Sequence, residues 1–305
     1  MTNTSVLQQK NRIRDSYVDR ATNYVIYVIL IFIALVTIYP IIYVFSASFS
    51  DPTAVNSGRV LLWPVGFQIE GYQEIFKNQW ILTGYKNSLI YTVFGTVLNL
   101  FVTFTASYAL ARKDIYGRTI LNIFMIIPMW FTGGLIPTFL TVSAVGLINK
   151  TYTLIILGAI NIYNFIICRT FIMNSIPGEL QESARIDGCS DIGIMTKIVF
   201  PLSTPVLAIL TLFYGLEHWN NYFTALIYLN SREYMSLQIF LREILIQNVV
   251  FEGDPLELVD SVRRAYMLQV MRYGVIVVSS VPMLILYPFV QRYFVQGVMI
   301  GALKG

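Results

Sequence analysis

The chain has 305 residues, of which 56% are hydrophobic and only 12% are charged, and its mean hydropathy is +0.63. A chain this apolar is unlike a soluble globular domain, so composition excludes a soluble enzyme and places the protein in a lipid bilayer. The formal net charge is +4, and the chain has one histidine and two cysteines. These are too few for a metal framework, and neither a metal site nor a nucleic-acid partner is expected.

Six uncharged stretches follow one another along the chain. Each is long enough to cross the ~30 Å hydrocarbon core of a bilayer, which takes about 20 helical residues. Their continuous apolarity favours helices over the alternating strands of a membrane barrel. We therefore predict an all-α, polytopic membrane protein with a tail at 1–23, a membrane domain at 24–294 and a second tail at 295–305. The six predicted transmembrane helices lie near 24–45, 88–111, 119–140, 151–171, 198–223 and 273–290.

Basic residues close to the predicted spans indicate the orientation of the chain. They lie in the N-terminal tail and in the short connection after the second span: Lys10, Arg12, Arg14, Arg20, Arg112, Lys113 and Arg118. Such segments stay in the cytoplasm, so both termini and the loop at 175–203 are expected there. The first span ends without a small-x-small cleavage site and should remain in place. Cys168 and Cys189 then both lie on the cytoplasmic side, where we expect packing residues and no disulfide.

The third span belongs to an unusually long uncharged run. Residues 119–149 would measure about 46 Å as one helix at ~1.5 Å per residue. The run also contains Pro128, Gly133, Gly134 and Pro137, so we expect it to be bent or partly a loop. Two interpretations stay open, because such a break either lines a pathway or is a plain kink in a packing helix.

The loop at 175–203 is polar and acidic, although it lies between two apolar segments. Pro177 presets the first turn of a helix, and Glu179 and Glu182 lie where the helix dipole favours negative charge. Gly188 offers a left-handed stop. A second helical stretch is predicted at 191–199 and should end where Pro201 and Pro205 appear, because proline lacks the backbone donor. The pattern predicts two short helices joined by a glycine turn, parallel to the membrane.

The residues of this loop resemble a known motif. The segments ELQESARIDG at 179–188 and IVFPL at 198–202 resemble the EAA loop of ABC-importer permeases, which docks into a cytoplasmic ATPase. The sequences WNNYF at 219–223 and GVMIGALKG at 297–305 narrow the resemblance to permeases for carbohydrates, especially oligosaccharides. The resemblance implies a type I importer fold and assigns ATPase coupling to Glu179, Glu182, Ser183, Ala184, Asp187, Gly188 and Pro201. Ser183 departs from the expected alanine, and the alternative is an ordinary solvated connection.

The resemblance also implies partners. The chain has no Gly-x-x-x-x-Gly-Lys-Ser/Thr phosphate loop, so it is not expected to bind ATP or act as an enzyme, and no catalytic residue is assigned. ATP and Mg would be bound by two partner ATPase subunits in the cytoplasm. A related but different permease subunit would complete a heterodimer, and an extracytoplasmic binding protein would deliver the sugar. The expected location is the cell membrane of a prokaryote, with alternating access as the mechanism.

A polar and aromatic cluster in the fifth span suggests a sugar pathway. Amides exchange hydrogen bonds with sugar hydroxyls, and aromatic rings stack on sugar C–H faces. The candidates are Glu217, Trp219, Asn220, Asn221 and Tyr222, with Asn161 and Asn164 of the fourth span as a weaker pair. Alternative interpretations are an interfacial anchor for Trp219, a packing role for His218 and hydrogen bonds between helices for the two asparagines of the fourth span.

Three other functional classes compete with this interpretation. A self-contained secondary sugar transporter would need no ATPase, but paired half-helix signals in two matching halves are not found. A membrane enzyme would need a convergent catalytic set, whereas the chain has one histidine, and Glu217 is the single carboxylate within the spans. A structural anchor would lack a polar pathway.

Overall fold

The computed structural model describes residues 17–246 and 258–302, and the regular structure in these two ranges is helical. Three basic residues used for the orientation, Lys10, Arg12 and Arg14, lie outside the described residues, as do the last three residues of the predicted C-terminal tail. The elements are α1 Tyr17–Ser48, α2 Pro52–Asn56, α3 Glu70–Lys77, α4 Gln79–Ala111, α5 Arg118–Trp130, α6 Leu135–Ala144, α7 Thr153–Ile156, α8 Ile162–Ser175, α9 Gly178–Ile186, α10 Asp191–Ile194, η1 Met195–Val199, α11 Phe200–Leu202, α12 Thr204–Trp219, α13 Phe223–Tyr228, η2 Arg232–Tyr234, α14 Leu237–Ile246 and α15 Leu258–Ala302.

Within the described residues, three helices are each long and apolar enough to cross a membrane: α1, α4 and the part of α15 at Tyr266–Pro288. Two bent pairs could each form one more span. The prediction of an all-α membrane fold is confirmed, while the count of six spans stays a prediction. Helix α4 begins nine residues before the predicted span, because the Asn78 side chain caps it by accepting hydrogen bonds from the amides of Trp80 and Ile81.

The third predicted segment is broken, as its proline and glycine content indicates. Helices α5 and α6 make an angle of 116°. Gly134, just before α6, has a φ of +80°, which a residue with a Cβ rarely adopts. The predicted span at 151–171 differs from the structure, which has the short α7, a connection that contains Gly158 at φ +77°, and then α8. The sequence analysis missed this glycine break.

The fifth and sixth segments also have other bounds than predicted. The chain bends by 79° at Ser203, between α11 and α12, so the predicted span at 198–223 includes the end of the preceding loop. The helical stretch Asp191–Leu202 continues through Pro201 and ends between Pro201 and Pro205, as the sequence predicts. Helix α15 continues to Ala302, beyond the predicted end at 290 and into the predicted tail.

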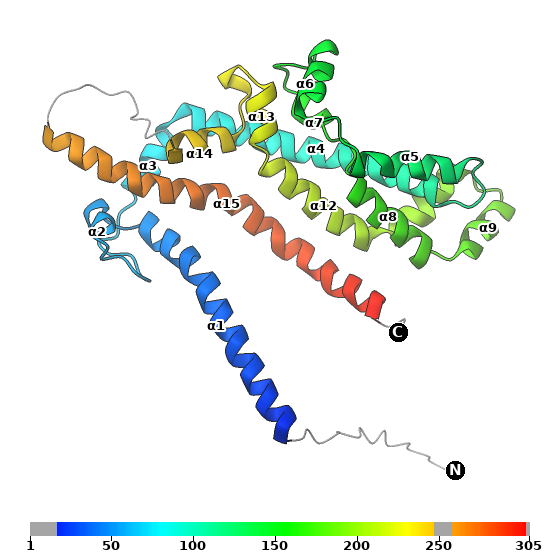
Figure 1. Ribbon diagram of the computed structural model, residues 1–305, viewed down its shortest axis with the longest axis horizontal. Helices are drawn as coiled ribbons and strands as arrows, with labels where there is room; N and C mark the ends of the chain where they lie inside the picture. The colour runs from blue at the N-terminus through cyan, green and yellow to red at the C-terminus, as the bar shows by residue number, and fades with distance from the viewer. Residues whose placement is uncertain (1–16, 247–257, 303–305) are drawn as a thin grey trace.

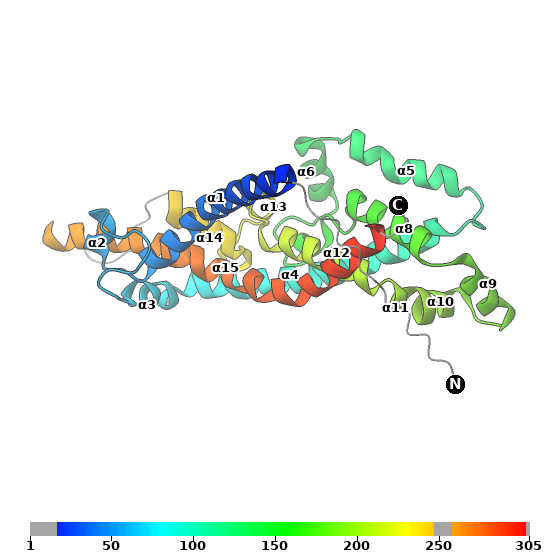
Figure 2. The same ribbon diagram turned by 90° about the horizontal axis from the view of Figure 1, so that it is seen from below.

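The long helices run lengthwise through the molecule. Figures 1 and 2 show α4, α12 and α15 along its long dimension, with α9 at one end and α2, α3 and α14 at the other. A buried cluster at the α9 end joins α4, α8 and α12 through Phe104, Cys168, Val206 and Leu210. A second cluster joins α3, α4, α14 and α15 at the opposite end. Helix α4 belongs to both clusters.

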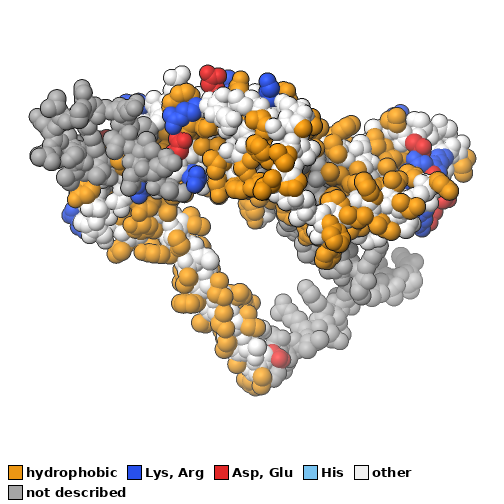
Figure 3. Space-filling model, turned by 45° about the horizontal axis from the view of Figure 1, so that its top comes forward, with side chains coloured by type: hydrophobic (Ala, Val, Ile, Leu, Met, Phe, Trp, Pro, Cys, Tyr) orange, Lys and Arg blue, Asp and Glu red, His pale blue; other side chains and the backbone are white. Residues whose placement is uncertain are grey.

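The surface is apolar over the middle of the molecule. Figure 3 shows hydrophobic side chains across the centre of the visible face and along α1, with charged side chains gathered toward the two ends. The most apolar window of α1 has no buried residue. Exposed apolar side chains of this number are what a lipid environment accepts, whereas a soluble monomer rarely exposes such continuous patches.

Candidate functional site

The candidate site is the segment from α9 to α11, which we call the elbow (residues 178–202). Its first helix, α9, follows Pro177 as the sequence predicts. Ala184 is the single buried residue of α9 and packs with Ile172 and Ile176 at the end of α8. Leu180, four residues before Ala184 on the same face of the helix, is 45% exposed. Helix α9 therefore lies on the surface of the helix bundle.

Gly188 ends α9 in the manner predicted. Its φ is +78°, and its amide donates to the carbonyl of Arg185 while the amide of Cys189 donates to the carbonyl of Ala184. This pair of bonds is a Schellman motif, which needs a left-handed residue. A Cβ at Gly188 would meet nothing within 4 Å. The glycine is thus required by backbone conformation, and crowding within this chain does not explain it.

The second half of the elbow is anchored in the bundle. Ser190 caps α10 by accepting a hydrogen bond from the amide of Gly193 at 3.2 Å. The helix then widens into a π-helical turn, η1, and Ile194 and Val199 are fully buried against α4, α8 and α12. Pro201 is exposed, and the bend at Ser203 turns the chain into α12. The elbow is therefore loosely packed along α9 and firmly packed along α10 and η1.

Two arginines and two aspartates join the elbow to the end of α4. Nη2 and Nε of Arg112 donate to the two carboxylate oxygens of Asp114 at 2.6 and 3.0 Å. Nη1 of Arg112 lies 2.7 Å from Oδ1 of Asp191. Nη2 of Arg185 lies 2.9 Å from Oδ2 of Asp114 and 3.5 Å from Oδ1 of Asp191. Each arginine thus contacts both aspartates.

The charges hold Asp114 in its ionised form. The Arg112 guanidinium, assisted by a backbone amide and by Arg185, keeps the pKa of the Asp114 carboxyl well below its usual range. A lowered pKa adds stability that is present above the ordinary aspartate value of ~3.9 and is lost only as the pH falls through the lower folded value. Asp114 therefore stays ionised and paired with the two arginines at physiological pH.

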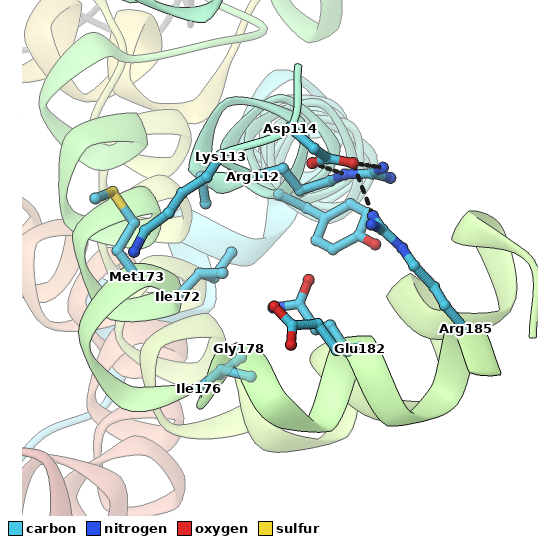
Figure 4. Close-up of a pocket in the computed structure, with 12 residues that line it drawn as sticks. Arg112, Lys113, Asp114, Ile172, Met173, Ile176, Gly178, Glu182 and Arg185 are labelled. Atoms are coloured by element: carbon cyan, nitrogen blue, oxygen red, sulfur yellow. Dashed lines mark hydrogen bonds and ion pairs between the residues drawn. The ribbon is translucent and has the colours of Figure 1, made fainter. Parts of the chain in front are cut away.

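Figure 4 shows a groove between these charged residues and α9. The end of α4, the end of α8 and the first turns of α9 line it, and the Glu182 side chain points into it. Glu182 makes no ion pair with any residue of 17–246 or 258–302, whereas Arg185 is engaged by both aspartates. Glu179, Ser183, Asp187 and Gly188 are exposed, so six of the seven predicted coupling residues are on the surface, and Ala184 is buried beneath them.

The predicted pathway residues divide into buried and exposed groups. Trp219 is 1% exposed, and its Nε1 donates to the carbonyl of Ser279 in α15 at 2.9 Å while its ring meets Tyr85 edge-on. An interfacial anchor is therefore not what the structure shows for Trp219. His218 is buried, and its Nε2 lies 3.1 Å from Oδ1 of Asn99, in agreement with the packing alternative.

The exposed group lies where α12 ends. The Asn220 side chain donates to the carbonyl of Leu216, and Oδ1 of Asn221 accepts from the amide of Thr224. Tyr222 is 41% exposed, and the guanidinium of Arg242 in α14 lies over its ring, 6.0 Å from the centroid. Helix α12 ends at Trp219, so residues 220–222 form the link to α13 and are not within a span helix.

The second predicted pair begins α8. Asn161 caps this helix by accepting from the amides of Tyr163 and Asn164, and it also bonds the exposed side chain of Glu217. Asn164 is 3% exposed. The structure thus brings Asn161 and Glu217 together across α8 and α12.

Comparison with known proteins identifies the family. The chain is 39% identical over 287 residues to the polygalacturonan/rhamnogalacturonan transport system permease protein YtcP of Bacillus subtilis, covering 94% of this chain and 99% of that protein. The chain therefore belongs to the permease subunits of carbohydrate ABC importers. The permease also matches a crystal structure of a bacterial ABC transporter involved in the import of the acidic polysaccharide alginate, with 35% identity, a TM-score of 0.84 and coverage of 92% of this chain and 99% of that chain.

More distant relatives agree with this membership. An arabinooligosaccharides transport system permease protein, AraQ of Halalkalibacterium halodurans, is 30% identical and covers 90% of the permease and 94% of its own length. No family model matches the chain. The resemblance drawn from residues 179–202 is confirmed, the permease lies in a membrane, and an ABC importer subunit is supported over a self-contained secondary transporter.

The sequence analysis missed the apolar tip of the permease's elbow. Ile186 is 87% exposed and Ile192 is 71% exposed, on either side of the Gly188 turn. The signal was available in the sequence, because these two isoleucines stand among charged and small residues at a turn. Two exposed isoleucines outside the predicted spans are what a protein-binding surface provides.

Gly188 gives a first prediction for the permease. Replacement by valine forces a β-branched residue into a left-handed conformation that costs about 1–2 kcal/mol. We expect Gly188→Val to tilt the tip of the elbow, and so to lower sugar uptake per ATP hydrolysed while membrane insertion stays normal. Gly188→Asn is the matched control, because asparagine adopts this conformation more easily. Equal uptake per ATP in the valine variant and the wild type would contradict the prediction.

Proposed function

We propose that this permease carries an acidic oligosaccharide into the cell and is driven by ATP that partner subunits hydrolyse. Two ATPase subunits would seat against the elbow from the cytoplasm, one against this chain and one against a second, homologous permease. An external binding protein would deliver the sugar. ATP-driven closure of the ATPases would move the elbow and open the bundle outward by alternating access. Neither ATP nor Mg would be bound by this chain.

The observation that carries the proposal is the surface of the elbow. It exposes two isoleucines beside four polar positions and is backed by buried residues of η1. An apolar tip with a polar rim is the usual composition of a protein interface. The basic residues Arg112 and Lys113 line the groove beside α9, and Arg118 begins α5 just after them. They favour a cytoplasmic position for this end, and with it cytoplasmic termini.

The proposed substrate class rests on two residues at the end of the molecule away from the elbow. Arg242 stacks on Tyr222 and has no carboxylate partner among the described residues. A guanidinium next to an aromatic ring offers a sugar acid both a bidentate partner for its carboxylate and a face for its ring. The permease relative with 39% identity is named for polygalacturonan and rhamnogalacturonan, and the structural relative serves the import of an acidic polysaccharide.

Uptake into proteoliposomes tests the proposal. The permease is co-reconstituted with its partner permease, ATPase and binding protein, and labelled trigalacturonate and maltotriose are supplied outside. We expect uptake of trigalacturonate that needs ATP and Mg inside the liposome and stops without the ATPase. Uptake that persists without the ATPase would favour a secondary transporter. Uptake of maltotriose alone would contradict the acidic substrate and leave the importer assignment intact.

The exposed asparagines give a prediction within this assay. Asn220→Leu together with Asn221→Leu removes two side-chain amides, and it also removes the hydrogen bond that Oδ1 of Asn221 accepts from the Thr224 amide in α13, which contributes about 1 kcal/mol. We expect the apparent KM for trigalacturonate to rise about tenfold, because two sugar hydrogen bonds are lost. Asn221→Ser is the control, since serine keeps a capping oxygen without the amide. An unchanged KM in the double variant would remove these residues from the pathway.

A further inference from the structure

The charged residues that join the elbow to α4 have a consequence for coupling, and this inference rests on the proposed function. We call Arg112, Asp114, Arg185 and Asp191 the latch. Two of them belong to the end of α4 and the turn after it, one to α9 and one to α10. Figure 4 shows Asp114 between the two guanidinium groups, with the side chain of Arg185 reaching across from α9. The latch therefore links the end of α4 to two elbow helices that are about 70 residues away in sequence.

Packing alone does not fix α9 against α4. Ala184 is the one buried residue of α9, and a single buried methyl group contributes on the order of 1 kcal/mol. Arg185 supplies the charged contacts of this helix, and both of its partners are themselves held by Arg112. The latch therefore supplies the charged contacts that join α9 to the end of α4.

Arg112 is the residue most suited to transmit a force. Its side chain is only 14% exposed, whereas ordinary surface ion pairs are solvated at both partners. The guanidinium lies 5.9 Å from the centroid of the Tyr108 ring, and the Tyr108 hydroxyl donates to the backbone carbonyl of Asp191 at 3.3 Å. The link from α4 to α10 is therefore made of an ion pair with a covered arginine and an exposed aspartate, together with a side-chain-to-backbone hydrogen bond.

Helix α4 continues from the latch to the opposite end of the molecule. There, Nδ2 of Asn87 donates to the carbonyls of Glu233 and Met235 at 2.7 and 3.0 Å. The Tyr91 hydroxyl donates to the carbonyl of Tyr234 at 2.7 Å, and Ser88 accepts from the amide of Leu237. One uninterrupted helix of 33 residues thus bonds the elbow at one end and the η2–α14 segment at the other.

We propose that the latch makes the elbow and α4 move as one body, so that its four residues are positioning residues for the coupling of ATP hydrolysis to transport. When the ATPase displaces the elbow, the latch passes the displacement to α4, and α4 passes it to the η2–α14 segment. Without the latch, α9 follows the ATPase while α4 stays behind. The ATPase then turns over with little sugar movement.

The test measures trigalacturonate imported per ATP hydrolysed in proteoliposomes that hold the complete transporter. We expect Asp114→Ala to lower this ratio about tenfold, a typical size for coupling between two sites. The complex should still assemble, and its melting temperature in detergent should stay close to that of the wild type. Glu74→Ala is the matched control, because it breaks an exposed ion pair within α3, in which Nζ of Lys77 lies 2.5 Å from Oε1 of Glu74. Its ratio should not change.

A second set of variants distinguishes residues that act together as one latch from residues that contribute independently. Arg185→Ala alone and Arg185→Ala combined with Asp114→Ala should lower the ratio to the same extent as Asp114→Ala, since either change breaks the 2.9 Å ion pair between Arg185 and Asp114, which joins α9 directly to the end of α4. Arg185→Lys, which keeps a charge, should restore a large part of the coupling.

Several outcomes would overturn the inference. A wild-type ratio in Asp114→Ala would show that the latch does not transmit motion. Losses that add in the double variant would show two separate contributions, and a fall in ratio accompanied by loss of assembly would reduce the latch to a structural role. If the wild-type complex imports no trigalacturonate with ATP, the proposed function fails instead, before the latch is reached.

Discussion

Gly95→Ala is expected to destabilise the bundle where α4 crosses α12. A Cβ at Gly95 would lie less than 3.0 Å from three atoms of the His218 ring. His218 is buried and bonded to Asn99, whose own Nδ2 donates to the carbonyl of Gly158 at 2.8 Å, so the ring has little freedom to move away. Overpacking of this kind costs about 1–3 kcal/mol. We expect the melting temperature of the detergent-solubilised transporter to fall by several degrees.

The chain offers a matched control for this substitution. A Cβ at Gly215, in the facing helix α12, would meet its nearest atoms at 3.7 and 3.9 Å, which is ordinary contact. Gly215→Ala should therefore be neutral or stabilising by up to about 1 kcal/mol, because alanine favours helix more than glycine does. Gly95→Ala combined with His218→Ala should recover part of the loss. If the two single alanine variants melt alike, the close approach of α4 to His218 is not a tight contact.

The features that sequence reasoning predicted are those with local causes. Gly188 was expected to end a short helix in a left-handed conformation, and it does so, because the stop depends on one residue and its neighbours. The break in the third span follows equally from its own glycines and prolines. The membrane class follows from composition. The glycine stop and the break in the third span each depend on residues close by in the sequence, and the membrane class depends on no particular contact.

Features that depend on distant partners could not be predicted. The latch joins Asp114 to Arg185, which is 71 residues away, and neither charge indicates the other in sequence. Trp219 looked like a pathway or interface residue, yet it is buried because Tyr85 and the carbonyl of Ser279 meet it from other helices. Tertiary contacts decide which face of α12 is covered, and helical periodicity alone leaves both faces possible.

The helices in the structure begin and end at other residues than the predicted spans, for a related reason. Charged or polar residues were taken as ends of helices, although a helix can continue past the bilayer into water or against other helices. Helix α15 therefore extends to Ala302, and α4 begins at Gln79, where Asn78 caps it. In the fourth segment, a left-handed Gly158 breaks a run that hydropathy reads as continuous.

Replacing Ile186 with glutamate is expected to abolish ATP-dependent uptake while the permease itself folds normally. The side chain is 87% exposed, so its replacement removes almost no packing within this chain. On the proposed function it lies under the ATPase, where a buried carboxylate without a partner is costly, by several kcal/mol. A penalty of that size lowers affinity at least a hundredfold. The ATPase should no longer co-purify with the complex, and uptake of trigalacturonate should be lost.

The contrast with the opposite end of the molecule makes this prediction specific. Leu61 is 62% exposed in the connection between α2 and α3, far from α9 along the long dimension of the bundle. Leu61→Glu adds the same charge to an exposed aliphatic position, but it should leave the ATPase bound. Ile186→Leu keeps the apolar tip and should retain uptake. An Ile186→Glu complex that keeps its ATPase and transports normally would mean that the elbow is not the docking surface, and the latch would then have no displacement to transmit.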